Sequence, residues 1–223
     1  MLKILYVDNH VIVVVKPPNT LSQADSTGDI DMLTIIKKYI KEKYNKKGNV
    51  YLGLVHRLDR PVGGVMVFAK SSKAASRLSN MIKERNISKK YLAVINGTIK
   101  DKEGVFEDYL IKKDDGNTEV TTKEKGKYSK LSYKVLEEKN NLSLVEVTLE
   151  TGRHHQIRVE FSSRGYPLYS DQRYGKGEKG DIALWAYELE FTHPTLKEKM
   201  KYTVYPYNTN EVWNSFNYIK SNK

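Results

Sequence analysis

The sequence predicts an α+β fold, in which a mixed, mainly antiparallel sheet forms the core and helices and loops flank it. Runs of β-branched residues, such as the one at residues 4–16, predict strands. The pair Asn140-Asn141 lies between the apolar runs 131–137 and 142–149, and it predicts a β-hairpin. Other stretches carry apolar residues three and four positions apart, which is the spacing of amphipathic helices.

The two longest helices are expected at residues 32–47 and 73–85. The hydroxyl of Ser72 is expected to cap the second helix, because it can accept a hydrogen bond from an unpaired amide of the first turn. A shorter helix is expected at 154–164, because a basic last turn followed by Gly165 is typical of a helix end.

The strand run at 4–16 is interrupted by Asp8-Asn9 and ends at Pro17, which has no amide hydrogen to donate. The polar segment 112–130 contains six lysines and two glycines, and predicts a mobile surface loop. No Pro-, Gly- or Ser-rich linker divides the chain, so we expect a single domain over residues 1–223. Further strands are expected at 65–69, 91–95, 182–191 and 199–205.

The composition indicates a polyanionic partner, because the formal net charge is +11. Most of the 38 basic residues are lysines, and five of the eight arginines fall within residues 57–60 and 153–164. Arginine makes planar, bidentate contacts to phosphate and carboxylate, so this clustering marks a site. The chain has no cysteine, which fits a cytoplasmic protein and excludes disulfides, thiolate chemistry and zinc sites with cysteine ligands. No apolar run approaches the roughly 18 residues of a membrane span, so no membrane contact is expected.

The histidines do not predict a metal site. His154 and His155 are adjacent, so they should diverge on a helix or a strand and could not easily share one ion. His10 and His193 lie in turn-like contexts and are expected to be structural.

The segment His56-Arg57-Leu58-Asp59-Arg60 places one carboxylate between two guanidinium groups. An opposite charge nearby favours the ionised carboxylate, so Asp59 suits a nucleophile or a charge anchor better than a general acid. Taken alone, the segment indicates a structural cluster of ion pairs more than a catalytic site, because short charged strings are common on protein surfaces.

Five segments, taken together, resemble the RluA family of RNA pseudouridine synthases. The first is HRLDRPVGGVMVFAK at 56–70, which resembles the family's HRLD signature. The others are the strand and Lys-Pro turn at 6–17, KKYLAVING at 89–97, TGRHHQIRV at 151–159, and the YPLYSD…YG segment at 166–175. They occur in the family's order, and the resemblance covers most of the chain.

The chain departs from the family's pattern in several places. Val62 and Gly63 stand where Thr-Ser is common, His154 replaces a threonine, and Ser170 replaces a glycine before Asp171. Pro18-Asn19-Thr20 is a further difference. These changes affect loop contacts and substrate preference, and they remove no group that the family's reaction needs.

The resemblance implies that the protein isomerises uridine to pseudouridine in RNA, with Asp59 as the essential carboxylate. It further implies that Tyr91 stacks on the target base and can relay a proton, and that Arg153 is the counter-ion of Asp59. The resemblance and the charge of the side chains suggest RNA contacts for His56, Arg57, Arg60, Lys89, Lys90 and His155. For His56 and His155, local hydrogen bonding is an equally open alternative.

The implied reaction needs no metal and no cofactor, because it is an isomerisation without redox change. The expected partner is a structured ribosomal or transfer RNA, and the protein is expected to be a cytoplasmic monomer. The family's small S4-type RNA-binding module is not expected, because the matched pattern begins by residue 4. Substrate choice would then lie in loops such as 19–31 and 112–130, or in the fold of the RNA. For 112–130, plain solvent exposure is equally open.

Two alternatives to the synthase remain open. A nucleoside N-glycosidase could also use an ionised aspartate near the sugar C1′, but it usually needs a second acid to protonate the leaving base. No such residue stands out beside Asp59. A non-enzymatic RNA-binding protein could retain the same scaffold, and RNA modification would then be absent.

Overall fold

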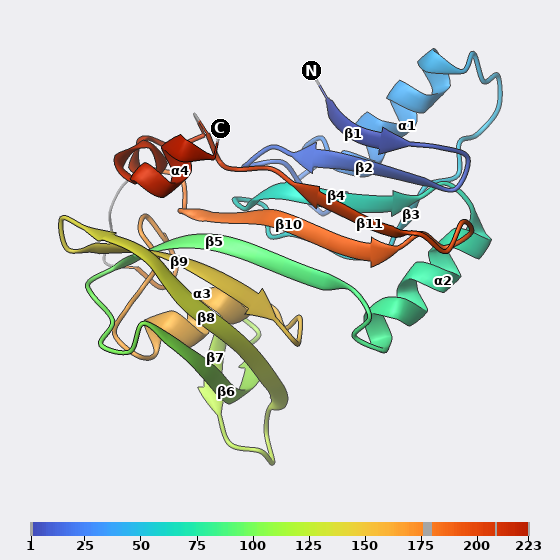
Figure 1. Ribbon diagram of the computed structural model, residues 1–223. Coiled ribbons are helices and arrows are strands. Elements are labelled where there is room, and N and C mark those ends of the chain that lie inside the picture. The colour runs from blue at the N-terminus through green and yellow to red at the C-terminus, as the bar shows by residue number, and fades with distance from the viewer. Residues whose placement is uncertain (1, 176–179, 208, 223) are drawn as a thin grey trace. The chain divides into compact units, whose positions relative to one another are not determined.

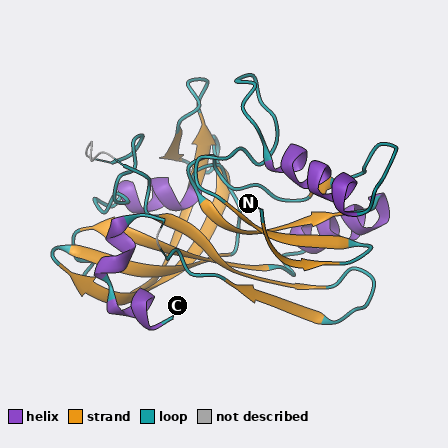
Figure 2. Ribbon diagram, turned by 90° about the horizontal axis from the view of Figure 1, so that it is seen from above, coloured by secondary structure: helices purple, strands orange, loops and turns teal. Residues whose placement is uncertain are grey.

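The computed structural model describes residues 2–175, 180–207 and 209–222, and its helices and antiparallel strands confirm the α+β fold (Figure 1). Figure 2 shows that strands make up most of the regular structure. The chain forms two compact units: Met1–Ile87 with Glu188–Val204, and Ser88–Tyr187 with Tyr205–Lys223. The single domain expected over 1–223 stays a prediction.

The first unit contains an antiparallel sheet in which β2 lies between β1 and β4 (Figure 1). In the same unit β3 pairs with β4, and β11 pairs with the last residues of β10. The predicted break at Asp8-Asn9 is confirmed, because β1 and β2 flank it. The strands are β1 (Lys3–Val7), β2 (Val11–Lys16), β3 (Gly53–Leu54), β4 (Gly63–Ala69), β11 (Lys199–Thr203) and the part of β10 (Leu184–Thr192) from Glu188 onward.

The core of the first unit lies between this sheet and helix α2 (Ser72–Lys83). Strands β2 and β4 are buried along their whole length, and Leu78 of α2 packs into the same cluster as Val67 and Phe191. Helix α1 (Met32–Lys43) buries Met32, Ile36 and Ile40, which recur every four residues as the periodicity predicts.

The predicted cap at Ser72 is wrong by one residue. Ser71 is the N-cap of α2, with φ −146° and ψ 155°, and its hydroxyl accepts a hydrogen bond from the Ala74 amide. Two serines in succession both suit the role, and the extended backbone of Ser71 decides which one fills it.

The second unit contains an antiparallel sheet in the order β5-β9-β8-β6-β7. The predicted hairpin at Asn140-Asn141 is confirmed, because these residues join β8 to β9 with φ of 53° and 58°. Two positive φ values in a two-residue loop match the right-handed twist of the strands. The elements are β5 (Ser88–Asn96), β6 (Glu103–Lys112), β7 (Thr118–Thr121), β8 (Lys127–Lys139), β9 (Leu142–Leu149), α3 (Gln156–Ser162), η1 (Glu211–Ser215) and α4 (Asn217–Ser221).

The mobile loop predicted at 112–130 is wrong for much of its length. Strands β6 and β7 form a hairpin, and β8 already begins at Lys127. At the turn, the carboxylate of Asp115 accepts a hydrogen bond from the Asn117 amide at 2.8 Å. The charged side chains of these strands hide the strand pattern, and β7 lies at the edge of the sheet, where such charges are common.

Helix α3 covers one face of the second sheet. The ring of Phe161 lies 5.1 Å from that of Phe106 on β6 and 5.6 Å from that of Tyr133 on β8. The helix is shorter than predicted and begins at Gln156 rather than His154, because His155 has φ 51° and ψ 24° and so lies outside the right-handed helical region.

Candidate active site

Asp59 lies in the first unit, in the loop 55–62 that connects β3 to β4. The Val62 amide donates to the Asp59 carbonyl at 3.0 Å, which closes a tight turn directly after the carboxylate. Asp59 is half-buried, whereas the Leu58 side chain before it is buried in the core. Asp59 therefore sits in a loop that the core anchors on one side.

Lys16, the last residue of β2, fixes this loop through hydrogen bonds from its side chain. Its ammonium group is fully buried and donates to the carbonyl oxygens of Val62 at 2.6 Å, Arg60 at 3.0 Å and Pro17 at 3.1 Å. Burial lowers the pKa of Lys16 to about 7, and the negative charge of Asp59 opposes this shift. The lysine of the predicted Lys-Pro turn thus fixes the main chain on the C-terminal side of Asp59.

Ser22 holds the loop on the other side of Asp59. Its hydroxyl donates to the Leu58 carbonyl at 2.8 Å and accepts from the Leu58 amide at 3.2 Å, and all of these groups are buried. Sequence reasoning did not identify Lys16 or Ser22 as parts of the site, because each acts on main-chain groups far away in the sequence.

The other residues predicted near Asp59 have different surroundings. His56 is half-buried, and its Nε2 accepts a hydrogen bond from the Val67 amide of β4 at 3.1 Å, so this atom serves the fold. Arg57 is exposed. Arg60 forms an ion pair with Asp29 at 2.6 Å.

Tyr91 lies in the second unit, on β5, and is buried on the sheet face that α3 covers, opposite Val147 of β9. Because side chains alternate along a strand, Lys89 shares this face and Lys90 points to the other one. The ammonium of Lys89 lies close to Gly152, only 3.4 Å from the point where a Cβ atom on that residue would sit, and burial lowers the pKa of Lys89. Lys90 instead pairs with Glu146 at 3.4 Å.

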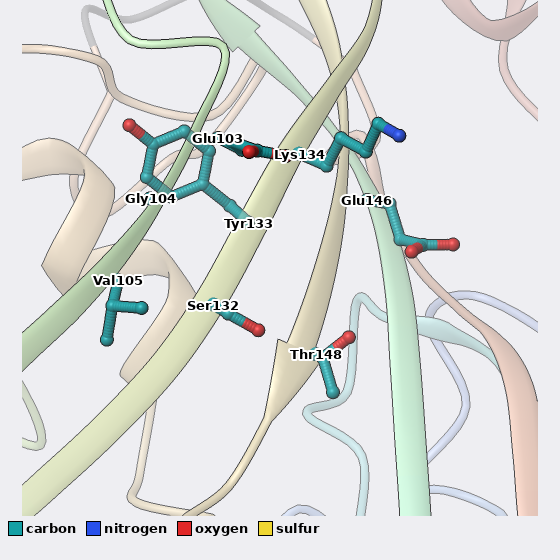
Figure 3. A pocket seen from close by; sticks show the side chains of 8 residues that line it. All are labelled: Glu103, Gly104, Val105, Ser132, Tyr133, Lys134, Glu146 and Thr148. Carbon is teal, nitrogen blue, oxygen red and sulfur yellow. The ribbon is translucent and has the colours of Figure 1, made fainter.

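A hollow of about 440 Å³ lies on the second unit and involves β6, β8 and β9 (Figure 3). Glu146, the partner of Lys90, is one of its lining residues. None of the predicted site residues lines this hollow, so it gives no support to their assignment. The lining residues are Glu103, Gly104, Val105, Ser132, Tyr133, Lys134, Glu146 and Thr148.

The two arginines of the segment 151–158 differ sharply in burial. Arg153 is exposed, and its Nε donates to the Tyr128 carbonyl at 2.8 Å. Arg158 has a side chain that is only 5% exposed, and it makes a bidentate pair with Asp171 at 2.8 and 2.6 Å. Although burial raises the pKa of Asp171, the hydrogen bonds and charge of Arg158 bring it below its ordinary value. Arg158 was not selected as a candidate from the sequence. Its position next to Ile157, which was expected to face inward, could have indicated that Arg158 is buried.

The residue before Asp171 explains one departure from the family's pattern. Ser170 is buried and adopts φ 57°, a left-handed conformation that glycine adopts without strain. The serine therefore keeps the backbone turn that a glycine would make at this position, at a cost of about 1–2 kcal/mol.

The expectation that His154 and His155 diverge is wrong. Their rings stack with centroids 3.7 Å apart, because the left-handed backbone of His155 turns its side chain back. The Nδ1 of His154 is bonded to the Thr118 hydroxyl at 2.9 Å, and that of His155 to the Tyr174 hydroxyl at 2.8 Å. The pair thus connects the segment after β9 to the start of β7.

A buried carboxyl group supports the same segment. Glu160 of α3 is fully buried, accepts a hydrogen bond from Ser129 at 2.6 Å and receives the side-chain amide of Gln156 at 3.3 Å. Burial raises the pKa of Glu160 to about 7, against the effect of these hydrogen bonds. The Gln156 oxygen in turn accepts from Thr151 at 2.9 Å and from the Arg153 amide at 3.0 Å, so Glu160 positions the backbone of 151–153.

Within the described residues, no three His, Cys, Asp or Glu side chains gather as a metal site would require. His10 and His193 have structural surroundings. The buried ring of His193 lies 3.0 Å from the Asp8 carboxylate and accepts backbone amides, and the His10 amide donates to the same carboxylate. Among the helices described, none has the length and apolar character needed to cross a membrane.

The family model and the relatives that match this chain all belong to the RNA pseudouridine synthases. The family model described as RNA pseudouridylate synthase matches residues 10–163. An uncharacterised RNA pseudouridine synthase of Bacillus subtilis is 32% identical over 202 residues, which are 88% of this chain and 66% of the relative. The ribosomal large subunit pseudouridine synthase D of Nitrosomonas europaea is 31% identical over 204 residues, which are 86% of this chain and 58% of that protein. The chain thus spans less than two thirds of the length of these two relatives.

A solved structure, human RNA pseudouridylate synthase domain containing 4, has the same fold. Its TM-score is 0.76 at 22% identity, and the match covers 91% of this chain and 87% of the human one. The family resemblance that the five sequence segments predict is confirmed, and the chain belongs to the RNA pseudouridylate synthase family.

Proposed function

We propose that the protein is an RNA pseudouridine synthase that isomerises specific uridines of a structured RNA, with Asp59 as the essential carboxylate. The observation that carries this proposal is the fixed main chain on both sides of Asp59. Lys16 binds the carbonyls of Arg60 and Val62, and Ser22 binds Leu58. A loop held this firmly by buried polar groups keeps its carboxylate in one place, which a reaction at a single carbon atom requires.

The reaction breaks the bond from N1 to C1′, turns the uracil, and forms a bond from C5 to C1′. The proton on C5 is lost and N1 gains one, so that atoms and electrons balance without an oxidant or a cofactor. Asp59 can attack the sugar carbon or the base, or it can stabilise or deprotonate the sugar after cleavage. The target uridine must leave its stack to reach the carboxylate, at a cost of a few kcal/mol.

Tyr91 is proposed to stack on the target base and to relay the C5 proton. Its place on a buried strand, on the face that α3 covers, supports a fixed ring. The counter-ion of Asp59 is proposed to come from the segment 151–158. Arg153 is the residue that the sequence indicates, and Arg158 is a second candidate because it is buried and rigidly held by Asp171.

The proposed RNA contacts differ in how available their side chains are. Arg57 and Arg60 are exposed on the Asp59 loop and suit phosphate or base contacts. Lys89 and His155 are half-buried in the second unit. Lys90 and His56 are weaker candidates, because Lys90 pairs with Glu146 and the Nε2 of His56 binds backbone. The names of relatives, such as the ribosomal large subunit pseudouridine synthase D, support ribosomal RNA as the first substrate to test, with transfer RNA next. We further propose a cytoplasmic monomer.

Tritium release tests this function. RNA labelled at C5 of uridine is prepared from total ribosomal and transfer RNA of a strain that lacks the protein. The wild-type protein should release tritium to water, and Asp59→Asn should abolish release while it keeps RNA affinity. Asp101→Asn makes the same change at an exposed site in the second unit and should leave release unchanged.

The alternatives give different outcomes in the same assay. Free uracil in the products would identify an N-glycosidase. RNA binding without tritium release on any RNA would identify a non-enzymatic RNA-binding protein. Full release by Asp59→Asn would show that another group does the chemistry.

A further inference from the structure

An ion pair joins the Asp59 loop to a second loop of the first unit. The guanidinium of Arg60 lies 2.6 Å from the carboxylate of Asp29, and the two side chains are 45% and 51% exposed. Arg60 directly follows Asp59, so this pair lies beside the proposed catalytic carboxylate. A guanidinium makes the same forked contact with a carboxylate as with a phosphate.

Asp29 belongs to a surface loop whose ends are fixed and whose middle is exposed. At the base, the Met32 amide donates to the Leu21 carbonyl at 2.8 Å, and Ser22 is bonded to Leu58. Residues 23–30 are all exposed. Asp29 thus reaches Arg60 from a loop that is anchored to the same catalytic segment at its base.

The ion pair is too exposed to be needed for the fold. Pairs between solvent-exposed side chains contribute little to stability, because water and salt screen them. The Asp59 loop already has buried supports in Lys16 and Ser22. Asp29 is therefore expected to act by changing which ligands Arg60 can bind.

We propose that Asp29 occupies the place of an RNA phosphate on Arg60, and that RNA binding exchanges the carboxylate for a phosphate. Asp29 then acts as an internal competitor. An RNA whose phosphate reaches Arg60 must displace the carboxylate, so Asp29 weakens the binding of RNAs whose backbone passes beside Asp59. This inference rests on the proposed function for RNA as the ligand.

Binding of an RNA without uridine tests the exchange apart from catalysis. The probe is a short fluorescent single-stranded RNA of A, C and G only, and anisotropy gives its Kd at low salt. Asp29→Asn should bind about two- to five-fold more tightly than wild type, as expected for loss of an exposed ion pair. Glu42→Gln removes one negative charge from an exposed position on α1 in the same unit, and should change the Kd by less than about 1.5-fold.

A double-variant cycle assigns the effect to Arg60. In an Arg60→Gln background, Asp29→Asn should no longer tighten binding beyond the Glu42→Gln control. A purely structural pair would give the opposite result, in which Asp29→Asn lowers stability and leaves binding equal or weaker. Equal tightening with and without Arg60 would also overturn the proposal.

Failure of this inference and failure of the proposed function look different. If tritium release occurs but Asp29→Asn leaves the Kd unchanged, the exchange is wrong and the enzyme stands. If Asp29→Asn tightens binding only when Arg60 is present and no RNA releases tritium, the exchange stands and the enzyme is wrong.

Discussion

Replacing Lys16 by methionine should separate the position of Asp59 from the stability of the fold. Methionine is of similar length and can fill the buried space, but it donates no hydrogen bond. The carbonyl oxygens of Pro17, Arg60 and Val62 then lose their shared donor. The Asp59 loop should shift, because the carbonyls of Arg60 and Val62 lie within three residues of Asp59 and lose their link to the end of β2.

The expected change in stability is the difference between two opposing effects. A shift of the Lys16 pKa from 10.5 to about 7 means that the charged form is destabilised by about 5 kcal/mol, as the net effect of burial and of the opposing attraction of Asp59. Three hydrogen bonds to a charged donor return about 1.5–3 kcal/mol each. The free energy of unfolding of Lys16→Met should therefore fall by no more than about 4 kcal/mol, and it can stay nearly unchanged.

The activity should fall much further than the stability. A displacement of about 1 Å at a reacting group can lower the rate about 100-fold. We therefore expect tritium release by Lys16→Met to drop about 100-fold in kcat, with RNA affinity within about two- to three-fold of wild type. Urea unfolding at the assay temperature shows whether the variant is folded.

Lys70→Met is the matched control. Lys70 follows β4 at its other end and donates to the Asp8 carbonyl, so its loss should lower stability without lowering kcat. If folded Lys16→Met keeps full activity, the lysine does not position Asp59. An equal loss of kcat in both lysine variants would also refute the reasoning.

Three further predictions concern the core and the buried charges. Leu78→Ala should lower the free energy of unfolding by about 2–5 kcal/mol in urea, because Leu78 is fully buried and leaves a cavity. Arg158→Met should cost about 3–5 kcal/mol, because Asp171 would stay buried without its partner, and Arg158→Met with Asp171→Asn should recover part of this loss. Glu160 has a pKa raised from 4.5 to about 7, so the folded state holds its proton more tightly and stability falls as the pH rises through this window. Glu160→Gln should remove up to about 3 kcal/mol of this fall, seen as the difference from wild type in urea unfolding at pH 5 and pH 8.

Local sequence patterns correctly predicted the elements that depend on neighbouring residues alone, such as tight turns and amphipathic helices. Asn140-Asn141 predicted a hairpin because few residues other than glycine tolerate two positive φ values in succession, and the structure has both. The apolar spacing of 32–47 predicted a helix, which forms as α1 over Met32–Lys43. The prediction was wrong for residues 44–47, because the end of a helix depends on where the chain turns next. Here Asn45 adopts φ 47°, outside the right-handed helical region.

The β6–β7 hairpin shows where local patterns fail. Phe106 and Leu110 are the only buried residues among the ten of β6, and the strand also carries three acidic residues and one lysine, so it alternates poorly. Its stability comes from pairing with β8, whose residues follow much later in the sequence. No window of sequence as short as a strand contains that information.

The same limit applies to the arginines of the candidate site. In sequence, Arg153 and Arg158 are equally charged members of one motif, and the choice of Arg153 depended on its place before a helix expected to begin at His154. The left-handed backbone of His155 moves the helix start to Gln156, which leaves Arg153 on an exposed turn and places Arg158 inside the helix, against Asp171. A guanidinium in water is screened and flexible, whereas a buried one with both hydrogen bonds made is fixed. If orienting a catalytic carboxylate requires a fixed charge, burial rather than motif position should decide which arginine does so, and that property exists only in the folded chain.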